Sequence, residues 1–250
     1  MEKEILAALE VLRAGGLILY PTDTVWGIGC DATNAEAVEK IYKLKQSENK
    51  TSMIVLCRDA DMIVRYVNKA PGIAFEVMEM SEKPLTLILQ GAVGVAANLI
   101  PEEGTLGVRV PNHEFCQQLI RKFGKPIVST SANISGEPTP LKGLKDVEKV
   151  IIDGVDFVVN PRFQGKPTCQ PSSIIAFGER GEVEIIRKLY GADNPHAYTA
   201  ALCRFRLLWS RQQHRPAVLF RCGQGGVVSG VVATDGCAEA YPRDDCVGAE

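Results

Sequence analysis

The chain has 250 residues, of which 46% are hydrophobic and 23% are charged, and its formal net charge at pH 7 is −2. These values exclude a disordered or fibrous protein, and the near-neutral charge gives no global attraction to nucleic acid or to an anionic membrane. No apolar run reaches the roughly 18 residues that a membrane span needs, and the first residues do not form a signal peptide. We therefore expect a cytoplasmic protein with no membrane segment, whose eight cysteines are reduced and mostly buried.

The composition changes near residue 190. Every lysine and every isoleucine lies before that point, the last being Lys188 and Ile186, whereas the positive charge of residues 191–250 is carried by arginine alone. At roughly 150 residues per domain, the length leaves room for one domain and an appendage. We predict a catalytic domain over residues 1–190 and, over residues 191–250, an atypical tail that is poorly ordered or of different origin.

The first 190 residues alternate helical and strand patterns. Helices are predicted near residues 5–12, from a cap at Asn34 to residue 44, from Asp59, near residues 73–80, and from a cap at Asn112 to Gly124. Strands are predicted at residues 17–20, 53–57, 85–90, 106–110, 126–128, 157–159, 173–177 and 183–187. His113, beside the predicted cap, is expected at the surface. The pattern predicts an α/β domain, and several neighbouring strands without a helix between them favour a mixed rather than a purely parallel sheet.

Small polar or cationic residues interrupt these patterns, mostly beside a predicted strand. The segments are residues 20–31, 43–50, 105–111 and 129–136, and residues 171–175 place hydroxyls before a late strand. Ligands of α/β proteins bind at strand ends, so these segments are candidate site residues. Structural roles stay open for two of them, because Trp26 suits the core and the lysines of residues 43–50 suit the end of a helix dipole.

The side chains in these segments are hydroxyls, an amide, lysines and arginines. Arg109 alternates with valines on a predicted strand and therefore needs a solvated or anionic partner, such as a carboxylate. The hydroxyls after residues 127–128 suit phosphate oxygens. The phosphate-loop and dinucleotide glycine motifs are absent, as are a Ser-His-Asp order and HExxH. This inventory predicts positioning and charge stabilisation of phosphates, with no catalytic nucleophile.

In this order, the segments resemble the YrdC-type family of threonylcarbamoyl-AMP synthases. Residues 22–31 are similar to the family's PT[DE]T-V-[YFW]-G-[LIV]-G segment, residues 105–111 to its strand ending in V-R-x-P/T, residues 129–133 to S-x-S-A-N, and residues 172–175 to S-[ST]-I-I. The resemblance spans nearly all of residues 1–190. It implies a YrdC-like twisted mixed β-sheet with flanking helices around a deep cationic cleft.

The resemblance also implies a reaction and its site residues. L-Threonine, bicarbonate or CO2, and ATP with Mg²⁺ would give threonylcarbamoyl-AMP and pyrophosphate. A downstream threonylcarbamoyl transferase would then modify adenosine 37 of tRNAs, and a weak contact with tRNA is a further expectation. By resemblance, threonine would be bound by Thr22, Arg109, Ser129 and Ser172, and ATP by Lys45, Lys50, Thr105, Ser131, Asn133 and Arg187.

One departure from the family concerns its K-x-R motif, which a further lysine follows. Ser47 stands where the arginine is expected, and Lys50 lies one position before the later lysine. Because lysine cannot reproduce a bidentate guanidinium fork, we expect retained threonine binding with weaker or altered handling of ATP. Three alternatives stay open: an RNA-binding module of the same fold, a relative that transfers a carbamoyl group, and an inactive paralogue.

Overall fold

The computed structural model describes residues 1–47, 53–179, 182–187 and 220–222. In this part of the chain the strands form one sheet in the order β11-β10-β9-β5-β6-β3-β7-β2-β1-β8, and β4 pairs with β5. The strands are β1 (Ile18–Tyr20), β2 (Gly27–Gly29), β3 (Ile54–Leu56), β4 (Val67–Lys69), β5 (Leu85–Ala92), β6 (Thr105–Arg109), β7 (Ile127–Ser131), β8 (Phe157–Val158), β9 (Ser173–Phe177), β10 (Val183–Arg187) and β11 (Phe220–Cys222). The pairs β3–β6 and β5–β9 are parallel, whereas β5–β6 and β3–β7 are antiparallel. The predicted mixed sheet is confirmed.

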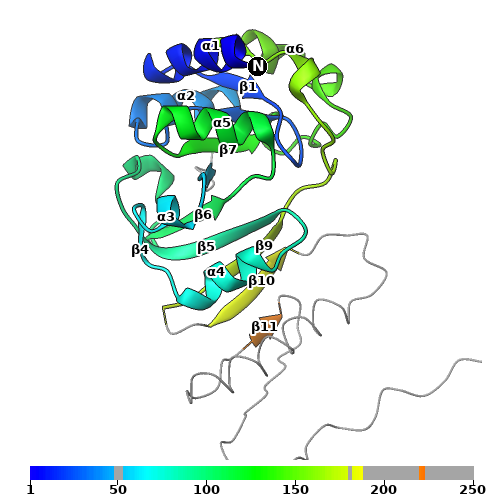
Figure 1. The fold of residues 1–250 in the computed structure, drawn as a ribbon. Helices are drawn as coiled ribbons and strands as arrows, with labels where there is room; N and C mark the ends of the chain where they lie inside the picture. Colours follow the sequence, from blue (N-terminus) through cyan, green and yellow to red (C-terminus); the bar gives the residue numbers. More distant parts are fainter. Residues whose placement is uncertain (48–52, 180–181, 188–219, 223–250) are drawn as a thin grey trace, which may run out of the picture.

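Helices cover the sheet. They are α1 (Glu2–Arg13), α2 (Ala35–Leu44), α3 (Ala60–Ile63), α4 (Gly72–Glu79), α5 (Glu114–Phe123) and α6 (Lys149–Asp153), with short 3-10 turns at Ala97–Leu99, Leu144–Asp146 and Pro161–Phe163. Figure 1 shows α1, α2 and α5 gathered beside β1 and β7, and α4 beside β5, β9 and β10. No helix in the described ranges is long and apolar enough to cross a membrane.

Local chemistry explains where two of the helices begin and end. The Asn34 side chain accepts hydrogen bonds from the N–H groups of Glu36 and Ala37, which confirms the predicted cap of α2. The predicted cap at Asn112 is wrong. Residue His113 precedes α5 and makes no capping bond, and it is buried rather than at the surface. Gly124 ends α5 with a φ of 76°, as expected of a left-handed glycine cap.

Strand β2 was not predicted, because its sequence Gly-Ile-Gly lacks the alternation of a strand. It pairs antiparallel with both β1 and β7. A Cβ atom on Gly29 would lie 2.7 Å from the Tyr20 ring and 2.7 Å from the Val128 carbonyl oxygen. Glycine therefore lets three strands approach closely at this point, immediately after the polar segment that begins at Pro21. Strand β4 was also missed.

Two further sequence predictions concern the tail and the cysteines. Of residues 191–250, the described part is β11, which lies parallel to β10. The prediction for the rest of the tail falls outside the described residues. Three thiols (Cys30, Cys57 and Cys116) are free and buried, as expected, whereas that of Cys169 is free and exposed.

Candidate active site

A cavity of about 230 Å³ opens where the segment after β1, the ends of β6 and β7, and the start of β9 come together. Its lining side chains are mainly hydroxyls, apolar groups and two guanidinium groups. The lining residues are Thr22, Thr24, Val25, Trp26, Gly27, Met53, Ile54, Arg109, Ser129, Thr130, Ser131, Thr139, Pro171, Ser172, Ile174 and Arg187. The fold thus brings together polar segments that are up to about 165 residues apart in the sequence.

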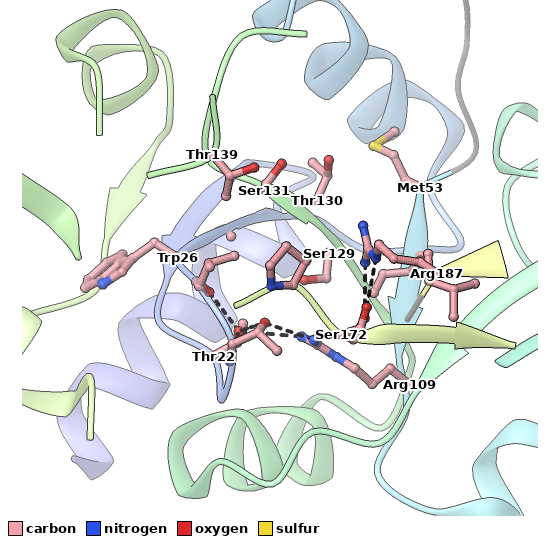
Figure 2. A pocket seen from close by; sticks show the side chains of 16 residues that line it. Thr22, Trp26, Met53, Arg109, Ser129, Thr130, Ser131, Thr139, Ser172 and Arg187 are labelled. Atoms are coloured by element: carbon pink, nitrogen blue, oxygen red, sulfur yellow. Dashed lines mark hydrogen bonds between the residues drawn. The ribbon is translucent and has the colours of Figure 1, made fainter. Parts of the chain in front are cut away.

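Arg109 is held at the floor of this cavity by the threonines that follow β1. Its Nη1 donates to Thr24 Oγ1 at 2.9 Å, and its Nη2 lies 3.5 Å from Thr22 Oγ1. Because the Thr22 hydroxyl donates to the Val25 carbonyl at 2.7 Å, the hydroxyl of Thr24 must donate to Thr22 across their 2.9 Å contact. The donor and the acceptor of each of these hydrogen bonds are therefore fixed, and the bonds orient the guanidinium group of Arg109 (Figure 2).

Asp23 lies behind Arg109 and does not line the cavity. Its Oδ1 is 3.5 Å from Arg109 Nη2, and its Oδ2 accepts the backbone N–H of Asn112 at 3.1 Å. Arg109 is only 3% exposed, and its buried Nε–H has no hydrogen-bond partner in the described part of the chain. A buried donor without a partner is costly. Arg109 also lines the cavity, so its guanidinium charge can act on a ligand bound there.

Ser172 and Arg187 form the opposite side of the cavity. Arg187 Nε donates to the Ser172 carbonyl at 2.9 Å, and its Nη2 lies 3.5 Å from Ser172 Oγ. The Ser172 hydroxyl also contacts Thr86 Oγ1 at 2.7 Å. Burial, and to a smaller degree the positive charge of Arg109, lowers the pKa of Arg187. Each guanidinium therefore already lies in the electric field of the other.

Strand β7 supplies Ser129 and Ser131, two residues apart and so on one face of the strand. Beneath them the Lys45 ammonium donates to the carbonyl oxygens of Ser131 at 2.6 Å and of Asn133 at 2.5 Å. Burial lowers the pKa of Lys45 to about 8. Lys45 therefore supports the loop that follows β7 (the β7 loop) from behind and is not among the cavity-lining residues.

The predicted site residues fall into three groups. Six line the cavity: Thr22, Arg109, Ser129, Ser131, Ser172 and Arg187. Three others do not line it: Lys45 lies behind β7, Asn133 is buried with its amide nitrogen donating to the carbonyls of Ile134 and Glu137, and Thr105 begins β6 at the end away from Arg109. Lys50 lies outside the described residues.

The structure adds residues that the sequence did not single out. Thr139 lines the cavity, although nothing in its surroundings in the sequence indicates a site. Gln164 joins two segments, since its Oε1 accepts Trp26 Nε1–H at 2.8 Å and its carbonyl accepts His113 Nε2–H at 3.1 Å. The indole of Trp26 is buried and turned away from the cavity (Figure 2), which fits its expected place in the core.

The donor set of the cavity does not fit a resident metal ion. Among the described residues, its charged lining residues are two arginines, and no carboxylate or imidazole lines it. Across the described ranges, no group of three or more His, Cys, Asp or Glu side chains lies close enough to hold a metal. Hard cations such as Mg²⁺ prefer oxygen ligands, carboxylates above all. A magnesium ion here would have to be held by a ligand's own phosphates.

Fold and cavity together define a mixed α/β protein with a cavity between strand ends that is lined by hydroxyl groups and two arginines. The chain matches the Sua5/YciO/YrdC family, described as telomere recombination, over residues 10–188. It is 31% identical to the threonylcarbamoyl-AMP synthase of Pseudoalteromonas translucida over 176 residues, which are 69% of this chain and 92% of that protein. The chain therefore belongs to the Sua5/YciO/YrdC family.

Solved structures agree with this assignment. Sua5 of P. abyssi complexed with L-threonine superposes with a TM-score of 0.68 at 26% identity, over 76% of this chain and 55% of that one. This chain thus spans little more than half the length of that Sua5. E. coli YciO gives a TM-score of 0.65 at 26% identity, over 78% of this chain and 93% of its own.

Proposed function

We propose that this chain makes threonylcarbamoyl-AMP and pyrophosphate from L-threonine, bicarbonate or CO2, and ATP, for the threonylcarbamoylation of tRNA. It is an enzyme of the nucleotidyltransferase type, as its threonylcarbamoyl-AMP synthase relatives indicate. The observation that carries the proposal is the cavity, where Thr22, Ser129, Ser131 and Ser172 meet two guanidinium groups.

The reaction asks for alignment more than for covalent help from the protein. The threonine amine adds to CO2 and gives a carbamate, one carbamate oxygen attacks the α-phosphorus of ATP, and the bond to pyrophosphate breaks. Both steps gain from holding the reactants side by side and from cations near the developing charge. In this proposal Arg109, Thr22 and Ser172 orient threonine, and Ser131 and Arg187 face the α-phosphate.

Mg²⁺ is proposed to arrive with ATP as part of the substrate, because no acidic side chain in the described part of the chain lines the cavity to hold it. Lys45 would act on ATP only through the β7 loop, since its ammonium is engaged by two carbonyl groups. Transfer to adenosine 37 by a downstream enzyme, a weak contact with tRNA and a cytoplasmic location stay predictions.

The test is pyrophosphate release from ATP with Mg²⁺ and bicarbonate, measured with and without L-threonine. We expect release to depend on threonine and to fall about a hundredfold in Arg109→Ala, which loses the fixed donor of the site. Arg121 is an exposed arginine on α5, so Arg121→Ala is the matched control and should behave as wild type. Threonine-independent release would contradict the proposal, and salt-dependent tRNA binding without turnover would favour the RNA-binding alternative.

A further inference from the structure

The pairing between β9 and β10 is interrupted near the end of β10. Residues 183–185 of β10 pair antiparallel with residues 175–177 of β9 without a break. The next pair joins Arg187 to Ile174, so β10 has two residues where β9 has one. Such an interruption is a β-bulge, and Ile186 is the extra residue.

The two faces of β9 have different surroundings at this end. Ile175 and Phe177 are buried in the core, whereas Ile174 and Ser172, which comes just before the strand, line the cavity. Because successive side chains of a strand point to opposite faces, β9 has a core face and a cavity face here. A residue of β10 lies on the same face as its partner on β9. The pairing therefore decides whether a side chain of β10 reaches the core or the cavity.

Without the bulge, Arg187 would lie on the core face. In an unbroken ladder Ile186 would take Ile174 as its partner. Arg187 would then pair with Ser173, which is buried on the core face, and the guanidinium would lose its solvation at a high cost. The extra residue instead pairs Arg187 with Ile174, on the cavity face. There its Nε donates to the Ser172 carbonyl at 2.9 Å (Figure 2).

We propose that the bulge in β10 is a positioning element for the reaction, because its extra residue turns Arg187 from the core face into the cavity. This inference rests on the proposed function, in which Arg187 faces the α-phosphate of ATP. Ile186 is then a positioning residue that acts through Arg187. Its side chain is 54% exposed and is not needed for this role, whereas the number of residues before Arg187 is. Bulges are frequent next to active sites, where they redirect a side chain.

The most direct test removes the extra residue. Deletion of Ile186 leaves residues 183–185 paired with both neighbouring strands, and Arg187 can follow in an unbroken ladder, still opposite Ile174. Affinity for ATP with Mg²⁺, measured by calorimetry on the full chain, should therefore stay within about threefold of wild type. Threonine-dependent pyrophosphate release should be retained to the same degree. Arg187→Ala loses the guanidinium and should lower ATP affinity about tenfold and the release about a hundredfold.

The opposite change tests the same geometry. An alanine inserted between Ile186 and Arg187 moves the guanidinium one residue further along β10, opposite Ser173 and onto the core face. This variant should lose as much ATP affinity as Arg187→Ala does. Ile186→Ala is the matched control, because it keeps the number of residues and changes an exposed side chain, and it should behave as wild type.

The outcomes separate this inference from the proposed function. If deletion of Ile186 lowered ATP affinity as far as Arg187→Ala does, or prevented folding, the inference would be overturned, since an unbroken ladder keeps the other strand pairs. An insertion variant that binds ATP like the wild type would also overturn it. If ATP binding followed the expected pattern but no threonine-dependent release occurred, the proposed function alone would fall. If the wild type did not bind ATP, both would fall.

Discussion

At the scale of single residues, Lys45 shows how burial changes what a charged group does. It is 7% exposed, and its ammonium donates to two carbonyl groups on the loop that follows β7. Loss of solvation lowers its pKa to about 8, from a usual value of 10.5. Lys45 therefore fixes Ser131 and Asn133 in place at some cost to stability in its charged form.

This cost predicts a pH dependence. Between about pH 8 and 10.5 the unfolded chain binds the Lys45 proton more tightly than the folded one, so raising the pH through this window favours folding. Between these two pH values the free energy of unfolding of the wild type should rise, relative to that of Lys45→Met, by up to about 3 kcal/mol. Urea titrations at both ends of the window measure this difference. The contribution of the buried thiols to the pH dependence cancels, because both proteins have the same thiols. Parallel pH profiles for the two proteins would contradict the prediction.

Ser47 carries a second prediction at this scale. Its hydroxyl accepts a hydrogen bond from Ser135 at 3.0 Å, which places Ser47 beside the loop that follows β7. The family that the sequence resembles has an arginine at the position of Ser47. Ser47→Arg should lower the KM for ATP about tenfold in ATP–pyrophosphate exchange, because a guanidinium can grip phosphate oxygens bidentately. The KM for threonine should stay as in wild type. Ser47→Ala is the control without a cation, and an unchanged ATP KM in Ser47→Arg would count against the assignment.

At the scale of elements, β2 decides whether the cavity can form. It joins β1 to β7 and so brings Thr22 and Ser129 to the same place. Periodicity did not predict it, since three residues with two glycines carry no alternation. The longer strands β5, β6, β9 and β10 were predicted almost to the residue, because their apolar side chains reflect burial directly.

The close approach around β2 predicts a position-specific cost. Gly29→Ala should lower the free energy of unfolding by about 1–3 kcal/mol, because the added methyl meets the Tyr20 ring and a backbone carbonyl. Gly72→Ala is the matched control: Gly72 begins α4, and no described atom beyond the neighbouring residues and the helix's own backbone lies within 4 Å of the added carbon. That variant should be unchanged or up to about 1 kcal/mol more stable. Equal effects of the two changes in denaturant unfolding would show that β2 does not need its glycine.

At the scale of the whole molecule, sequence patterns identified which segments meet but not which way each side chain points. Thr22, Arg109, Ser129, Ser131, Ser172 and Arg187 do line one cavity. Asn133 and Lys45 were in the correct segments, yet the amide nitrogen of Asn133 and the ammonium of Lys45 are bonded to backbone carbonyl groups. Thr139 and Gln164 were not found, because a contact across the fold leaves no local signal in the chain.

The central claim is that this cavity joins carboxylated threonine to the α-phosphate of ATP. The most direct measurement is the mass of the adenylate formed when the chain is incubated with ATP, Mg²⁺, L-threonine and ¹³C-bicarbonate. The account predicts a threonylcarbamoyl-AMP that carries the label, together with an equal amount of pyrophosphate. An unlabelled threonyl-AMP would contradict it, because ATP would then have reacted with the amino acid's own carboxylate and not with a carbamate.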